Sequence, residues 1–185
     1  MFDVENLVAE CQTAIKEHTP ALAVRDVLRR TLDRPLEVAE AFAAQEGGLE
    51  FLHVSPELTV LHVTWAPGMQ LYPHNHEMWA VIGIYGGQED NTFFRRDGDG
   101  GRSLIESGGG KALRERDVLT LGDDTIHAVA NPLERLTGAI HVYGGDFVNQ
   151  PRSQWPPETR TEEPFDVSRL QDQFASANAA WRGTA

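Results

Sequence analysis

The chain has 185 residues, and its 16 lysines and arginines against 28 aspartates and glutamates give a formal net charge of −12. This length supports a single domain with one buried core. The negative charge disfavours phosphate backbones and anionic lipid, so we expect a small-molecule substrate, no nucleic acid and no membrane. The single cysteine, Cys11, has no intramolecular disulfide partner and no secretion signal is recognisable, so we expect a cytoplasmic protein.

Three helices are predicted before the rest of the chain. Apolar residues at three-and-four spacing over residues 3–18 indicate an amphipathic helix that ends before Pro20. Two further helices are expected over residues 21–32 and 35–44, the last of them ended by two glycines. Residues 1–48 should therefore form a helical segment.

From residue 49 onward the pattern is that of β-structure. Short runs rich in Val, Ile, Leu, Thr and aromatic residues alternate with Gly, Pro and Asp clusters, which is typical of an all-β sandwich or barrel. The expected strands are residues 49–54, 58–65, 74–85, 91–96, 103–107, 117–121, 126–130 and 136–143, with turns at 67–68, 86–87, 97–101 and 108–110. We expect this sandwich or barrel over residues 49–147, with residues 1–48 packed on it. Residues 148–185 should add a polar, proline-rich wrap over 149–164 and a short helix near 168–181.

The tripeptide His74-Asn75-His76 carries the strongest chemical signal. In a strand, residues two apart point to the same face, so both imidazoles should point into the barrel from the head of the strand predicted over 74–85. A third interior histidine, His127, follows a later turn. A bare H-x-H pair is more often two hydrogen-bonded histidines than a metal site, so spacing alone leaves both interpretations open.

These residues also carry a family resemblance. The pattern G-x5-H-x-H that ends at His76, followed by H-x3-N that begins at His127, resembles the two motifs of the cupin superfamily. The segment A-I-H-V-Y that ends at Tyr143, together with the helical prelude, is similar to the cysteine dioxygenase-type thiol dioxygenases, a branch of the cupins. The resemblance spans roughly residues 58–147. It implies a mainly β fold: a cupin double-stranded β-helix barrel, or jelly roll, with an N-terminal helical segment and a short C-terminal helix.

The resemblance also implies a site and a reaction. In that branch three neutral histidines bind iron(II), and a later histidine and tyrosine form a hydrogen-bond relay. Carried onto this chain, the metal ligands are His74, His76 and His127, and His141 and Tyr143 line the site. With Fe(II) and O2, such a site implies oxidation of a small thiol to its sulfinate. Imidazoles also suit zinc, copper and nickel, so the resemblance, not the residue type, names iron.

Departures from the branch bear on the substrate. Ala80 and Val81 stand where many cupins have a glutamate ligand, which favours a site of histidines alone. Cys11 lies on the first predicted helix, so the cysteine–tyrosine crosslink of the animal members cannot form. Ala139 stands in place of the relay serine, and residues 36–73 contain no arginine to bind an amino-acid carboxylate. These departures disfavour cysteine as the substrate.

Arg95 and Arg96 end the strand expected over 91–96, where alternation sends one of them inward. The inward arginine would bind a substrate carboxylate, and two solvated arginines are the alternative. Two other functions stay open: a zinc, manganese or nickel cupin acting as an isomerase, lyase or hydrolase, and a non-catalytic cupin that binds an effector through its metal. A homodimer paired through barrel edge strands also stays open.

Overall fold

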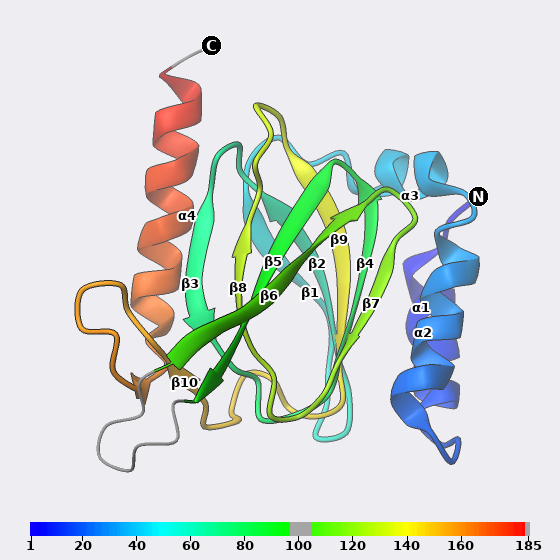
Figure 1. Cartoon of the computed structure of the whole chain (residues 1–185). Coiled ribbons are helices and arrows are strands. Elements are labelled where there is room, and N and C mark those ends of the chain that lie inside the picture. The colour runs from blue at the N-terminus through cyan, green and yellow to red at the C-terminus, as the bar shows by residue number, and fades with distance from the viewer. Residues whose placement is uncertain (97–104, 184–185) are drawn as a thin grey trace.

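The computed structural model describes residues 1–96 and 105–183. The helices within these residues are α1 (Val4–Ala14), α2 (Pro20–Thr31), α3 (Pro35–Phe42) and α4 (Val167–Arg182) (Figure 1). Proline begins α2 and α3, where its missing N–H needs no partner. The carboxylates of Asp3 and Asp166 accept hydrogen bonds from the first N–H groups of α1 and α4 and so cap them. No helix in the described part of the chain is long and apolar enough to cross a membrane.

The strands pair into two antiparallel sheets. They are β1 (Gly48–Val54), β2 (Thr59–Trp65), β3 (Gln70–His74), β4 (Ala80–Gly86), β5 (Gln88–Arg96), β6 (Ile105–Arg114), β7 (Val118–Leu121), β8 (Ile126–Ala130), β9 (Thr137–Tyr143), β10 (Ser153–Gln154) and β11 (Glu163–Pro164). The first sheet has the order β1-β2-β9-β4-β7 and the second β11-β10-β3-β8-β5-β6. Without β1, β10 and β11, this leaves the two four-stranded sheets of a jelly roll, the double-stranded β-helix. The predicted fold class is confirmed.

The strand predicted over residues 74–85 is wrong, because two elements occupy this range. β3 ends at His74, a loop follows in which Glu77 has a φ of 55°, and β4 begins at Ala80. The chain must break here because it crosses between sheets: β3 pairs with β8, whereas β4 pairs with β9. Because the apolar run continues into β4, the sequence gives no local signal of this crossing.

Two segments expected to be irregular are paired instead. Residues 108–110 lie within β6, where Gly108 is the extra residue of a β-bulge opposite Phe93 and Phe94. Within residues 149–164, Gln154 of β10 pairs with the edge strand β3. The turn expected over 97–101 and the start of the strand expected at 103 lie outside the described residues.

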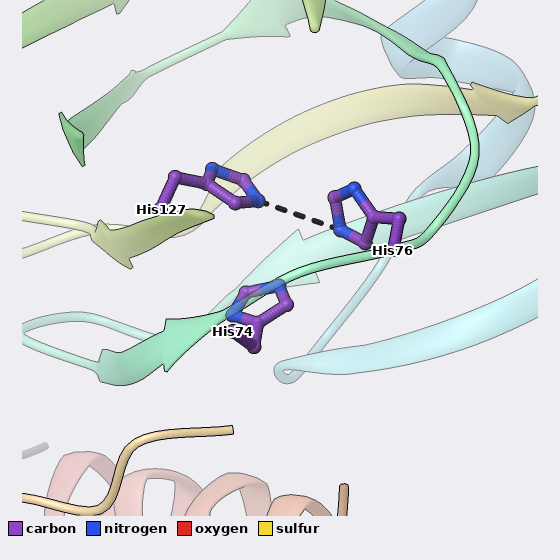
Figure 2. A group of neighbouring side chains, drawn as sticks. All are labelled: His74, His76 and His127. Carbon is purple, nitrogen blue, oxygen red and sulfur yellow. Dashed lines mark hydrogen bonds between the residues drawn. The ribbon is translucent and has the colours of Figure 1, made fainter. Parts of the chain in front are cut away.

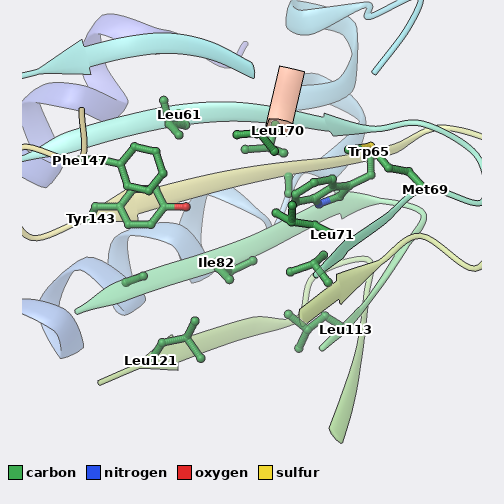
Figure 3. Close-up of a cluster of buried hydrophobic side chains, with 14 of the residues drawn as sticks. Leu61, Trp65, Met69, Leu71, Ile82, Leu113, Leu121, Tyr143, Phe147 and Leu170 are labelled. Atoms are coloured by element: carbon green, nitrogen blue, oxygen red, sulfur yellow. The ribbon is translucent and has the colours of Figure 1, made fainter. Parts of the chain in front are cut away.

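Two apolar layers hold the domain together. The inner layer fills the barrel between the two sheets and includes Leu61, Trp65 and Ile82 (Figure 3). The outer layer lies between the first sheet and the N-terminal helices and includes Leu28 and Val81. Strands β2 and β9 are buried along their whole length because they have a layer on each face. Helices α1 to α3 thus cover the first sheet, whereas α4 lies beside β3 (Figure 1).

We expect the thiol of Cys11 to be unreactive in the folded protein. Its side chain is fully buried in the outer layer, and this burial raises the pKa of the thiol to about 12. The reactive thiolate is therefore scarce at neutral pH. Dithionitrobenzoate should label no thiol in buffer and one thiol per chain in guanidinium chloride. Rapid labelling in buffer would contradict the packing of α1 on the sheet.

Candidate metal centre

Three imidazoles converge inside the barrel: those of His74, His76 and His127 (Figure 2). His74 ends β3, and His127 in β8 is its antiparallel partner. His76 lies in the loop after β3, so the loop, and not strand alternation, brings it to the other two (Figure 2). The three residues are 6%, 2% and 1% exposed, and one ring nitrogen of each lies within 4.8 Å of the others. This arrangement could hold a metal ion.

Hydrogen bonds determine which ring nitrogen of two histidines faces the site. Nδ1 of His74 lies 3.1 Å from the carbonyl oxygen of Tyr72, so Nδ1 carries the proton and donates it. Nδ1 of His127 likewise donates to Oδ1 of Asn91, at 2.7 Å. In both rings Nε2 therefore keeps its lone pair, which is the form that binds a metal.

The donor set fits a divalent metal. Nε2 of His127 lies 3.4 Å from Nε2 of His76, within hydrogen-bond distance, so a proton on His76 or a metal cation can bridge the two nitrogens. Burial lowers the pKa of all three imidazoles, to about 4 for His74, and the neighbouring imidazoles lower those of His76 and His127 further. The rings are therefore neutral at physiological pH, and three neutral nitrogen donors suit iron, zinc, copper or nickel.

From these lowered pKa values we expect metal affinity to be almost constant between pH 8 and pH 6. Protons compete with the metal only when pH approaches the ligand pKa, and that of His74 is about 4. Three exposed histidines with ordinary pKa values would instead lose roughly 65-fold in affinity over this range. Cobalt(II) titrations followed by visible absorption at both pH values measure the difference. A loss of that size would show that the histidines are not desolvated.

A buried carboxylate continues the network beyond His127. Glu89 on β5 is fully buried and accepts hydrogen bonds from Trp65 Nε1 at 2.6 Å and Asn91 Nδ2 at 2.9 Å. Its Oε2 also lies 3.3 Å from Nε2 of His141. Burial by itself raises the pKa of this carboxyl, but His141 and the hydrogen bonds together outweigh burial and hold the pKa below its ordinary value. Glu89 is therefore ionised inside the barrel.

The amide of Asn91 has one orientation that satisfies both neighbours. Its Nδ2 donates to Glu89 and its Oδ1 accepts from His127. If the amide were reversed, two donors would face each other at His127, or His127 would have to move its proton to Nε2 and lose its lone pair there. Glu89 thus determines, through Asn91, which nitrogen of His127 faces the metal site.

The structure brings His141 and Tyr143 to the same cavity as the three histidines. Nδ1 of His141 lies 3.1 Å from the hydroxyl of Tyr143. Because Nε2 of a neutral His141 donates to Glu89, its Nδ1 accepts the hydroxyl proton of Tyr143. The Tyr143 ring packs 5.0 Å from the ring of His76, and burial raises the pKa of the phenol. Tyr143, His141 and Glu89 therefore form a hydrogen-bonded chain that leads away from the site.

Arg95 and Arg96, expected at the substrate, do not reach the site. Arg95 pairs with Glu106 and Arg96 with Glu162, both at the surface. β8 pairs with β5 only as far as Phe94, so the two arginines lie on a two-stranded extension of β5 and β6. Among the described residues that line the barrel cavity, neither arginine is present.

A different arginine lies beside the site. The guanidinium carbon of Arg152, in the segment between β9 and β10, is 4.0 Å from the ring centre of Phe147 and 4.3 Å from that of Phe165. These rings contact His76 and His74 in turn. The Nε of Arg152 is buried without a hydrogen-bond partner. The guanidinium therefore has an unused donor next to the histidines.

The cavity between these groups is small. Its volume is about 30 Å³, and the three histidines, His141 and Tyr143 line it. Leu170 and Phe174 of α4 close it on the outer side, where Phe174 stacks on Trp65. A volume of this size accepts only one or two water-sized groups. The site is therefore a nearly closed chamber under α4.

Sequence reasoning missed Glu89, Asn91 and Arg152. The first two lie two residues apart on β5 and face inward together, so the pattern E-x-N-x-F that ends at Phe93 was a usable signal. No comparable signal marks Arg152, which lies in a polar, proline-rich segment beside many exposed residues. Its position follows from the way that β10 pairs with β3 and carries the preceding loop over the barrel.

No protein-family model matches the chain. Among solved structures, it is similar to an RmlC-like cupin family protein with a double-stranded β-helix fold from Methanocaldococcus jannaschii, with 13% identity, 56% of this chain and 84% of that chain covered, and a TM-score of 0.46. A conserved protein with a double-stranded β-helix domain from Klebsiella pneumoniae has 13% identity over 60% of this chain and 80% of its own, with a TM-score of 0.45. The cupin domain of Schizosaccharomyces pombe Cnp3 has 10% identity over 53% of this chain and 60% of its own, with a TM-score of 0.44. These three structures are described as cupin or double-stranded β-helix proteins. The strand order of this chain is itself that of a double-stranded β-helix.

Proposed function

We propose that this protein is a non-haem iron(II), O2-dependent oxidoreductase that oxidises a small thiol other than cysteine to its sulfinate. One observation carries the proposal: three buried, neutral imidazoles and the chain Tyr143–His141–Glu89 meet at one cavity. Held by the three histidines, iron(II) would supply open coordination positions for a thiolate and dioxygen together. The resemblance to the thiol dioxygenases supports iron over the other metals that imidazoles accept.

The proposed reaction balances without a further reductant. In R–SH + O2 → R–SO2⁻ + H⁺, the S–H and O–O bonds break and two S–O bonds form. Sulfur loses four electrons and dioxygen gains them. The single demand on the protein is to accept the thiol proton, because a thiolate is the form that binds a metal.

Tyr143 and His141 supply a path for that proton. The hydroxyl of Tyr143 donates its own proton to Nδ1 of His141, so its oxygen has lone pairs left to accept the thiol proton. As the phenol accepts one proton, it passes the other to His141, and the resulting imidazolium lies 3.3 Å from the carboxylate of Glu89. The buried negative charge of Glu89 stabilises this imidazolium.

Arg152 is the proposed anchor for an anionic group of the substrate. A carboxylate beside it would accept from the unpartnered Nε in a charge-assisted hydrogen bond. The phenylalanine rings on which the guanidinium lies hold it next to the histidines. Arg152 thus takes the role that the sequence suggested for Arg95 or Arg96.

Oxygen uptake by the iron(II) form tests the function. A panel of mercaptoacetate, 3-mercaptopropionate, cysteine and cysteamine separates thiols by their charged groups. We expect one O2 consumed per thiol, a sulfinate that carries both atoms of labelled dioxygen, and faster turnover of the simple thiol carboxylates. No uptake with any thiol would refute the proposal. Stoichiometric zinc in protein purified without added metal would instead favour a hydrolase, lyase or isomerase.

Replacing Arg152 with methionine should raise KM for thiol carboxylates by about 10- to 100-fold, because a hydrogen bond to a charged group contributes roughly 1.5–3 kcal/mol. The KM for cysteamine, which has no carboxylate, should change little. Arg95→Met is the matched control, since Arg95 lies at the surface with Glu106. Steady-state oxygen uptake measures both. An equal rise in KM for both kinds of thiol would indicate a structural defect and contradict the anchor.

A further inference from the structure

A second cavity opens on the surface outside the closed chamber. It has a volume of about 330 Å³ and lies between β1, the segment after β9 and the N-terminal half of α4. We call it the α4 groove. Its rim includes Phe51, Val148 and Val167, which are 49%, 52% and 53% exposed. A concave site of this size with a mostly apolar lining is typical of small-molecule binding.

The groove and the chamber share a wall. Leu49, Phe147, Leu170 and Phe174 line both cavities. The chamber, with its volume of about 30 Å³, is too small for a whole substrate. The rest of the substrate must therefore extend outward past this wall, and the α4 groove lies on its far side.

Arg152 lies at the boundary between the two cavities. It lines the groove, and its guanidinium packs on Phe147, which belongs to the shared wall. It is the single charged side chain among the described residues that line the groove. An anionic group bound to Arg152 would thus have the chamber on one side and an apolar surface on the other.

We propose that the substrate is an amphiphilic thiol whose anionic group binds Arg152 and whose apolar group, a ring or a short alkyl chain, occupies the α4 groove. The position of the thiol rests on the proposed function. The binding of an apolar carboxylate in the groove does not, because it requires neither the metal nor the reaction. A second copy of the chain or an apolar segment of another protein would be a rival occupant of the same surface.

Binding of carboxylates without a thiol tests the groove directly. Calorimetric titration of the full chain with butanoate, hexanoate and octanoate should show affinity that rises by about fourfold per methylene until the groove is filled. This rise should be the same with and without iron(II). Affinity that does not depend on chain length would overturn the proposal. If light scattering showed that octanoate dissociates a dimer into monomers, this would also overturn the proposal, because the groove would then bind a second copy of the chain.

Substitutions at two similarly exposed valines test whether the hydrocarbon chain of octanoate binds in the α4 groove. Val148→Asn, on the groove rim, should weaken octanoate binding by at least threefold. Val54→Asn should leave it unchanged, because Val54 is similarly exposed, at 44%, but does not line the groove. Both side chains are at the surface, so both variants should fold, and circular dichroism checks this. Equal effects of the two variants would overturn the assignment to the groove.

Turnover assays distinguish a failure of this inference from a failure of the proposed function. With the iron(II) form, 2-benzyl-3-mercaptopropionate should give a kcat/KM at least tenfold above that of 3-mercaptopropionate, and Val148→Asn should reduce this advantage. Binding that rises with chain length but no oxygen uptake would refute the thiol oxidation and support the groove. Oxygen uptake with no preference for an apolar group, together with flat carboxylate binding, would refute the groove alone.

Discussion

His127→Gln should lose bound metal, with an affinity at least 100-fold below that of the unchanged protein. Nε2 of His127 keeps its lone pair because Nδ1 donates to Asn91, and no other nitrogen among the described residues takes its position. Glutamine nearly matches histidine in size and can still donate to Asn91, so the buried site should stay packed. Loss of a ligand should cost more than the 10- to 100-fold typical of groups that only orient ligands. His74→Gln and His76→Gln should behave alike.

Metal content after purification and cobalt(II) titration measure this effect. His53→Gln is the control, because His53 lies on β1 outside the cluster. Its Nε2 lies 3.5 Å from Nε2 of Gln12, and not near the three histidines. The variant should retain full metal content. Normal metal content in any one of the three ligand variants would contradict a site formed by all three histidines.

Glu89→Gln should destabilise the metal-free protein by about 1–3 kcal/mol and weaken metal binding by about 10- to 100-fold. The carboxylate accepts from Trp65, Asn91 and His141 at once. Glutamine has a single side-chain oxygen, so its NH2 group must face at least one of these donors. A buried polar group without its partner costs about 1–3 kcal/mol.

The effect on metal binding passes through Asn91. If the NH2 group of the introduced glutamine faces Asn91, the asparagine amide must turn, and its new orientation favours the wrong proton position on His127. Urea denaturation measures stability and cobalt(II) titration measures affinity. Asp90→Asn is the matched control, since its side chain bonds Gln88 on the outer face of β5. Reduced stability with unchanged metal affinity would show that Glu89 does not orient the ligand.

Much of the fold is already present in the local pattern of residues. The prolines that begin α2 and α3 and the three-and-four spacing of α1 are local signals, and the three predicted N-terminal helices are present. The alternation of apolar runs with turn residues is also local, but it did not separate β3 from β4. Hydrophobic periodicity also indicates an all-β sandwich or barrel, because short strands at regular intervals can bury their apolar faces only against each other.

For the three histidines, the local sequence pattern predicts which residues form the site but not how they come together. The motif selected the three residues that the structure brings together, but a continuous strand over 74–85 is not what unites them. His127 reaches His74 through antiparallel pairing of β3 with β8, and His76 reaches both through a loop between two sheets. Sequence spacing identifies candidate donors, whereas their convergence depends on which strands pair.

The positions of the charged residues relative to the site depend on the tertiary structure alone. Arg95 and Arg96 lie beyond the point where β8 stops pairing with β5, and nothing in their own sequence marks that point. Glu89 is buried because Trp65, Asn91 and His141 satisfy its oxygens, and these partners lie on three different strands. Arg152 lies beside the site because a polar segment folds back against β3. A charged group is stable in a protein interior only where several partners form hydrogen bonds or ion pairs with it. Because these partners come from distant parts of the chain, the whole fold determines whether they come together.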